Sequence, residues 1–300
     1  MHKHGQEVEE SDYIDGCFLR SSTEKKLMKF DQLIASDTLI PSLPATVAQI
    51  FNEFQKFEPN IREITALVSS EMGLTVRVLR LLNSARYGSG GRIGTVEAAI
   101  PLLGLKAIKQ LVSAAAVGGA FREVPGVNMP EFWRHSLDVA KIAQSLADSM
   151  QLDKGLAFTA GLLHGVGDLV MKMAMPDQPC LQPDFAQDGN RHANQMAELG
   201  YSYADVGAAF ASQWRFPQEI VDAIQNHPNP QEDVESDTLA GILYLASWGA
   251  RAHELDLDTP SMLEQYPHHV ANAIGYTDGE RLCSEDPIEW TGPDEAGDFA

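Results

Sequence analysis

The sequence contains few cysteines, and their placement excludes the small folds that depend on them. Cys17, Cys180 and Cys283 are odd in number, widely separated and free of CxxC spacing, so they predict neither a disulfide framework nor a zinc ribbon. No apolar run reaches the roughly 18 residues that a membrane span needs, and the N-terminal residues lack the apolar region of a signal peptide. We therefore expect a cytoplasmic protein with no membrane partner.

Positive charge is also scarce. The chain has 22 Lys and Arg residues against 42 Asp and Glu residues, which gives a formal net charge of -20 at pH 7. Such a charge repels nucleic acids and anionic membranes at long range, so only a local basic patch could bind them. We expect no nucleic-acid partner. The hydrophobic share of 44% is that of a globular protein with a substantial core.

Long alternating patterns are absent, whereas apolar residues recur at helical spacing along most of the chain. Asn60, Thr95 and Asp153 stand where helices should begin, because their side-chain oxygens can accept from the free N–H groups of a first turn. Ser202 and Asp205 form a similar cap pair further on. The sequence therefore predicts an all-α protein, a multi-helix bundle.

Changes in composition divide the chain into four parts. Residues 1–22 are polar and predict a flexible lead-in, and residues 23–120 form an N-terminal helical half. Residues 121–256 form a second helical half. Residues 257–300 are expected to be an irregular acidic tail, because acidic residues accumulate toward that end.

An apolar stretch at 159–170 carries the clearest candidate for chemistry. It predicts a helix with His164 and Asp168 on one face, four residues apart, and an antiparallel preceding helix could bring His135 alongside. Imidazoles and carboxylates that converge from several helices can hold a catalytic metal. A buried histidine that is satisfied by a neighbouring group is the commoner outcome of such a pattern. The spacing leaves both interpretations open, and no phosphate-binding loop or nucleophile motif accompanies it.

Five segments, in this order along the chain, resemble the HDOD domain, the HD-related output domain of bacterial signalling proteins. They are LIPSLP (39–44), LRLLNSARYG (79–88), IGTVEAAIPLLG (93–104), FWRHS (132–136) and AGLLH (160–164). The resemblance runs from about Leu27 to Ala252. It implies an HD-like helical core in the second half and an N-terminal helical subdomain before it.

The related HD superfamily consists of metal-dependent phosphohydrolases, which hold metal with a His, a His-Asp doublet and a later Asp. By position, the resemblance places these ligands on His135, on His164-Gly165 and on Ser247. Two ligating carboxylates are therefore missing, which implies a degenerate site with no metal, no catalytic residue and no cofactor. Asp168 is the nearby carboxylate that could substitute, although one His–Asp pair supplies too few ligands for a catalytic metal.

The resemblance also suggests candidates for a pocket or an interface. Asn83, Arg86, Tyr87 and Trp133 lie where the two halves should meet, and packing or capping explains them equally well. Two further candidates are Tyr203, where family members often carry a His, and His227, which begins their His pair.

The resemblance implies a non-catalytic signal-transduction module whose partners are other signalling proteins. One alternative is a residual metal-dependent phosphohydrolase that acts on a nucleotide or cyclic dinucleotide through His135, His164 and Asp168. Another is a module that senses a small nucleotide ligand without turnover. In the non-catalytic interpretation, His164 is a structural remnant that is hydrogen-bonded inside the bundle, with Asp168 as its expected partner.

Overall fold

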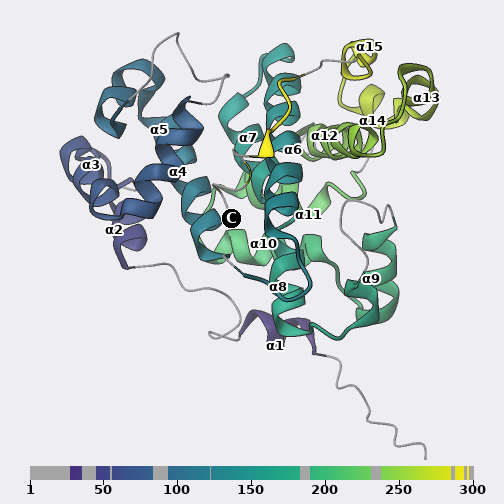
Figure 1. Ribbon diagram of the computed structural model, residues 1–300, viewed down its shortest axis with the longest axis horizontal. Coiled ribbons are helices and arrows are strands. Elements are labelled where there is room, and N and C mark those ends of the chain that lie inside the picture. Colours follow the sequence, from purple (N-terminus) through teal and green to yellow (C-terminus); the bar gives the residue numbers. More distant parts are fainter. Residues whose placement is uncertain are drawn as a thin grey trace, which may run out of the picture.

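The computed structural model describes residues 28–35, 45–54, 56–83, 94–121, 123–182, 190–230, 238–284, 288–293 and 296. Within these ranges the regular elements are α-helices and one short 3-10 helix, which confirms the predicted all-α class (Figure 1). None of the described helices combines the length and the apolar character that crossing a bilayer would require. The lead-in expected at residues 1–22 lies outside the described part of the chain.

The first helices are α1 (Phe30–Ile34), α2 (Ala45–Phe54), α3 (Ile61–Ser70), α4 (Met72–Asn83) and α5 (Val96–Ala120). Helices α2 to α5 pack on one another and form the N-terminal half. Helix α5 changes direction at Gly104, whose φ of 80° is open to glycine and costly for other residues. Pro101 lies three residues earlier, inside the helical stretch.

Helix α1 precedes this half in sequence but packs against α10 of the second half (Figure 1). The hydroxyl of Tyr201 donates to the carbonyl oxygen of Met28 at 2.7 Å, and the side chain of Gln213 donates to that of Ile34 at 3.1 Å. The predicted boundary at residue 23 assigns α1 to the N-terminal half, whereas these contacts join it to α10 of the second half. A helix of five residues carries too short a sequence pattern to show which core it joins.

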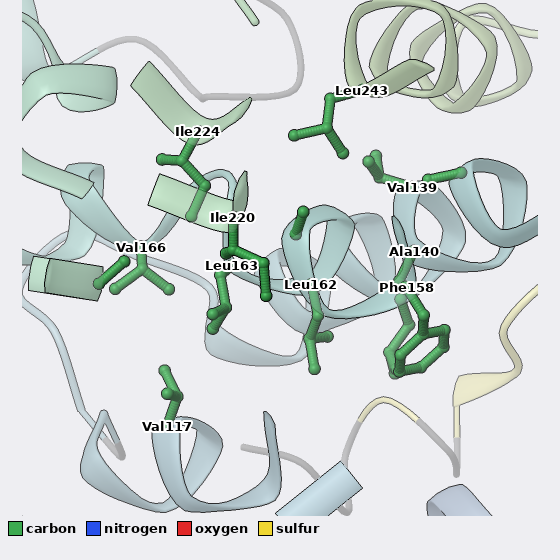
Figure 2. Packing of buried hydrophobic residues seen from close by; sticks show 14 of the residues in the cluster. Val117, Val139, Ala140, Phe158, Leu162, Leu163, Val166, Ile220, Ile224 and Leu243 are labelled. Atoms are coloured by element: carbon green, nitrogen blue, oxygen red, sulfur yellow. The ribbon is translucent and has the colours of Figure 1, made fainter. Parts of the chain in front are cut away.

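The second half contains α6 (Met129–Ser149), α7 (Lys154–Leu163), α8 (Val166–Ala174), η1 (Pro179–Leu181), α9 (Arg191–Leu199), α10 (Tyr203–Gln213), α11 (Gln218–Asn226) and α12 (Thr238–Glu254). Helix α6 is buried along most of its length because α7 and α12 pack against it. Side chains from several helices fill the core between them, including Val117, Ala140, Leu162, Ile224 and Leu243 (Figure 2).

The predicted N-caps are present. Asn60 accepts from two backbone N–H groups of α3, Thr95 from one of α5 and Asp153 from two of α7. Ser202 and Asp205 form a reciprocal capping box at the start of α10. A cap of this kind contributes about 0.5–2 kcal/mol, so these residues define helix starts that hydrophobic periodicity leaves vague.

The region after residue 256 differs from the irregular tail that the sequence predicts. Residues 257–284 fold into α13 (Thr259–Gln265), α14 (His268–Ala273) and α15 (Gly279–Leu282), which lie beside α12 (Figure 1). Beyond them, the backbone N–H of Thr291 donates to Asp138 of α6 at 2.8 Å, and Lys141 donates to the Thr291 hydroxyl at 2.9 Å. The acidic composition misleads because buried apolar residues, such as Tyr266, Val270 and Cys283, are interspersed among the charges.

Glycines set how closely the helices around the site approach. A Cβ atom added to Gly161 of α7 would lie 2.6 Å from the Cα atom of Ala140 on α6. One added to Gly167 of α8 would overlap the backbone of Tyr203 on α10. Only glycine permits these contacts, which bring the ends of α7 and α8 into the middle of the bundle.

Candidate functional site

Three histidines from three helices meet in the middle of the second half. His135 lies on α6, His164 directly follows α7 and His227 directly follows α11. The ring centroid of His164 is 5.5 Å from that of His135 and 5.5 Å from that of His227. All three side chains are buried. The expectation that His135 faces His164 across antiparallel helices is therefore met, and His227 joins them as a third ring.

The stretch predicted as one helix at 159–170 is two helices separated by a turn. Helix α7 ends at Leu163 and α8 begins at Val166, so His164 and Asp168 do not share a helix face. The backbone N–H of Asp168 donates to the carbonyl oxygen of Gly165 in this turn. A Cβ atom at Gly165 would lie 3.3 Å from the ring of Phe132, so a larger residue here would need a shift of this ring by a few tenths of an ångström.

Hydrogen bonds define the tautomers of two of the histidines. The Nδ1 atom of His164 lies 2.7 Å from the carbonyl oxygen of Gly161, and that of His227 lies 2.7 Å from the carbonyl oxygen of Ile224. Because a carbonyl oxygen only accepts, Nδ1 is the donor in both rings and Nε2 carries a lone pair. The Nε2 of His227 accepts from the Tyr203 hydroxyl at 3.1 Å. The Nε2 of His164 is buried and has no hydrogen-bond partner among the described residues.

His135 has a carboxylate as its neighbour. Its Nδ1 atom lies 3.1 Å from Oε1 of Glu254, at the end of α12. Burial alone would raise the pKa of Glu254, but the hydrogen bond and the charge of His135 hold it below its usual value. This carboxylate is therefore ionised and bound to a ring nitrogen. It lies two helical turns beyond Ser247, the position where the resemblance places a metal ligand.

The two innermost histidines are neutral at physiological pH. Burial holds the pKa of His164 well below its usual value, and the neighbouring His135 and His227 lower it further. Burial lowers the pKa of His227 to about 3, although its hydrogen bond to Ile224 acts in the opposite direction. Neutral rings with fixed Nδ1 donors resemble metal-binding histidines in this respect.

Asp168 makes different contacts from those expected. Its Oδ2 atom accepts from Arg191 at 2.7 Å and its Oδ1 atom from Gln195 at 3.0 Å, both from α9. The expected hydrogen bond between Asp168 and His164 is wrong, because His164 bonds to Gly161 instead. Arg191 and Gln195 are functional neighbours that the sequence reasoning missed. Arg191 and Gln195 are four residues apart on a helix, and this spacing could have indicated that both side chains lie on one face.

Arg191 and Gln195 also contact Tyr203. The guanidinium carbon of Arg191 lies 3.8 Å from the centroid of the Tyr203 ring. The side-chain oxygen of Gln195 accepts from the backbone N–H of Tyr203 at 2.7 Å. The network thus joins α8, α9 and α10, and the Tyr203 hydroxyl extends it to His227.

The side chains present do not fit the metal of the phosphohydrolases. Hard divalent cations such as Mg²⁺ and Mn²⁺ prefer carboxylate oxygens. Here both oxygens of Asp168 bind α9 side chains, and Glu254 binds His135 through Oε1, which leaves only its buried Oε2 without a hydrogen-bond partner among the described residues. Across the described ranges, no three His, Cys, Asp or Glu side chains are spaced to hold a metal ion. The guanidinium of Arg191 lies over the Tyr203 ring, and its charge contributes to the lowered pKa of His164 and His227, so it also disfavours a second cation there.

The remaining candidates divide into two groups. Trp133 is completely buried, with its ring edge-on to Phe132 at a centroid distance of 4.9 Å, so it is a core residue. Arg86, Tyr87 and the side chain of Asn83 lie outside the described residues.

Comparison with known proteins identifies relatives that match much or part of the chain. The profile of the HDOD domain matches residues 40–230. An uncharacterized protein of Treponema pallidum is 26% identical over 258 residues, which cover 84% of this chain and 48% of that protein. Ribonuclease Y of Thermus thermophilus is 30% identical over 127 residues, 42% of this chain and 17% of the enzyme. The chain thus spans about half or less of the length of these relatives.

Two crystal structures share the fold. A Shewanella amazonensis protein, provisionally described as a phosphohydrolase, superposes with a TM-score of 0.71 at 26% identity, over 89% of this chain and 100% of that one. An HDOD domain protein of unknown function from Geobacter sulfurreducens superposes with a TM-score of 0.62 at 24% identity, over 81% of this chain and 87% of that one.

Proposed function

Because the chain belongs to the HDOD domain family, we propose that it is a signal-transduction output module that binds protein partners and catalyses no reaction. The observation that carries this proposal is the use of Asp168, whose two carboxylate oxygens are both bound by α9 side chains. A metal-dependent hydrolase needs carboxylates that are free to hold the ion and to help activate its water.

Several features of the site support the absence of catalysis. Gly165 and Ser247 replace the two carboxylates that the superfamily uses, and the Phe132 ring packs against Gly165. Glu254 bonds to His135 instead of facing a shared metal position. The three histidines then serve as buried core residues: His135 joins α6 to α12 through Glu254, His227 joins the end of α11 to α10 through Tyr203, and His164 bonds to its own helix.

The surface supports a protein partner. Phe57 is fully exposed, between α2 and α3, and leaves a whole aromatic ring in water. Single exposed apolar side chains are common on protein surfaces, and Phe57 supports the proposal only as a candidate anchor that a partner could bury. The formal net charge of -20 favours a partner with a basic surface, because complementary charge speeds association.

The proposal is tested by assaying the full-length protein for phosphodiesterase activity. Nucleotides and cyclic dinucleotides are offered with Mn²⁺ or Fe²⁺, and the expected result is no turnover above the protein-free blank. Turnover that His164→Ala abolishes would overturn the proposal, because it would show that the histidines work on a metal.

One observation favours a residual phosphohydrolase as the second candidate. The rings of His135, His164 and His227 come from three helices, and each Nδ1 is held by an acceptor, as in many metal sites. The same turnover assay decides between the two. A small nucleotide is the candidate ligand for a module that senses without turnover, and it would raise the melting temperature in a saturable manner.

A further inference from the structure

An open groove of about 450 Å³ lies on the second half, where α1, α9, α10 and α11 come together. Apolar side chains line most of it, among them Phe30, Met196, Tyr201, Ala208 and Val221. Met196 is 42% exposed, so the described residues leave its side chain partly in water. A concave, mostly apolar surface of this size is typical of a binding site.

One carboxylate belongs to the groove. Asp205 is half-buried, and it is the one charged side chain among the described residues that line the groove. Its Oδ2 atom accepts from the backbone N–H of Ser202 at 2.8 Å and from the Ser202 hydroxyl at 2.9 Å, in the cap of α10. The Oδ1 atom remains for a further donor. The groove therefore suits a segment that carries apolar side chains next to a positive charge.

The chain enters the described structure beside this groove. The carbonyl oxygen of Met28, the first described residue, accepts from the hydroxyl of Tyr201 at 2.7 Å. Two residues later, the ring of Phe30 lies against the ring of Tyr201 at a centroid distance of 5.6 Å. Both rings line the groove, so the residues that precede Met28 are tethered at its wall.

The preceding residues contain a segment that matches the groove. Phe18 and Leu19 are adjacent apolar residues, and Arg20 follows them directly. Arg20 is eight positions before Met28, and a stretch of this length spans at most about 29 Å, which is enough to cross a groove of this volume. A short tether also holds the segment at an effective concentration of about a millimolar, so modest contacts suffice for binding.

We propose that residues Phe18–Arg20 of the same chain occupy this groove. Phe18 and Leu19 bury their side chains against the apolar lining, and the guanidinium of Arg20 donates to Oδ1 of Asp205. The chain itself then covers an apolar surface of the second half, and part of the lead-in predicted at residues 1–22 has a bound position. The inference goes beyond the proposed function and holds whether or not the protein catalyses a reaction.

The thiol of Cys17, directly before this segment, permits a test in the full-length protein. Ser212→Cys places a second thiol on α10 inside the groove, and Gln218→Cys places one on α11, exposed but outside the groove lining. Cys180 and Cys283 are buried, so they react slowly. Each variant is oxidised with diamide, and non-reducing electrophoresis with peptide mass mapping separates disulfides within one chain from those between two chains.

The disulfide from Cys17 to position 212 should form within one chain, at least about tenfold faster than the disulfide to position 218, because docking raises the local thiol concentration. Equal rates at the two positions would overturn the proposal, because the segment would then have no preferred place on the surface. Disulfides between two chains would also overturn it, because they would assign the groove to the segment of a second copy.

Variants within the segment test which side chains hold it. Phe18→Ser combined with Leu19→Ser should remove the difference between the two positions, because burial of these side chains stabilises the docked state. The matched pair Tyr13→Ser with Ile14→Ser should leave the rate unchanged. Arg20→Gln should slow the reaction by about two- to threefold, since a partly exposed ion pair contributes little.

A second groove position keeps the test decisive if Ser212→Cys does not fold. Gln225→Cys presents a thiol to the groove from α11 and is compared with Gln218→Cys in the same way. Rapid disulfide formation at position 225 that persists in the variant with Phe18→Ser and Leu19→Ser would contradict the proposal. Failure of the proposed function would appear instead as turnover by the wild type.

Discussion

The histidine side and the carboxylate side of the site differ in what they retain. On the histidine side, three rings converge from α6, α7 and α11 with centroid distances of 5.5 Å between successive rings. On the carboxylate side, Asp168 is bound to Arg191 and Glu254 to His135, while Gly165 and Ser247 carry no charge. The comparison teaches that imidazoles can cluster in a core while the carboxylates near them are bound by other side chains.

The largest effect is expected from Asp168→Ala, which removes the carboxylate from the buried cation. The free energy of unfolding should fall by about 3–5 kcal/mol, because Arg191 stays buried without its counter-charge. Urea denaturation at neutral pH measures this, with Asp222→Ala as the matched control on an exposed helix face. The control should change stability by about 0.5 kcal/mol or less. An equal loss of unfolding free energy in Asp168→Ala and Asp222→Ala would show that the buried ion pair contributes no more than an exposed carboxylate.

The histidine side should respond to pH. The folded state keeps His164 and His227 neutral, because their pKa values are lowered, to about 3 for His227, whereas the unfolded chain protonates them near pH 6.5. Stability is therefore greatest above that value and falls as the pH drops from 6.5 toward 3, by up to about 1.4 kcal/mol per pH unit for each ring. Unfolding of the wild type and His227→Gln at pH 7.5, 6.5 and 5.5 measures the slope. If His227→Gln loses stability with falling pH as steeply as the wild type, buried neutral His227 does not contribute to that pH dependence.

The smallest effect on stability is expected far from the site, at Phe57. Phe57→Ser should leave the free energy of unfolding within about 0.5 kcal/mol of the wild type, because the ring is fully exposed. It should nevertheless reduce the amount of partner that co-purifies from the native cell, while Leu255→Ser, 53% exposed on the second half, should not. Equal recovery with both variants would show that Phe57 takes no part in binding.

The sequence predicts those features that local patterns determine. The starts of α3, α5, α7 and α10 agree with the predicted caps Asn60, Thr95, Asp153 and Ser202, because a cap is a local signal. The convergence of His135 and His164 follows from the short connection between α6 and α7. The break at Gly165 was missed because the apolar residues on both sides resemble one continuous buried helix, although Gly165 and Gly167 offered a turn signal.

The rest of the site depends on contacts between distant residues. Arg191 and Asp168 are 23 positions apart in the sequence, and Glu254 and His135 are 119 apart. Local sequence patterns therefore cannot predict either pair. The resemblance pointed to the absent ligands, but it could not show what binds the carboxylates that are present. That information comes only from the three-dimensional arrangement.

The most direct test of the central claim, that the site is charge-balanced without metal, is the metal content of the full-length protein. The protein is purified without chelators and measured by inductively coupled plasma mass spectrometry. Far less than one Mn, Fe or Zn per chain is predicted, with the same low content in His164→Ala. About one metal ion per chain in the wild type, lost in His164→Ala, would contradict the account.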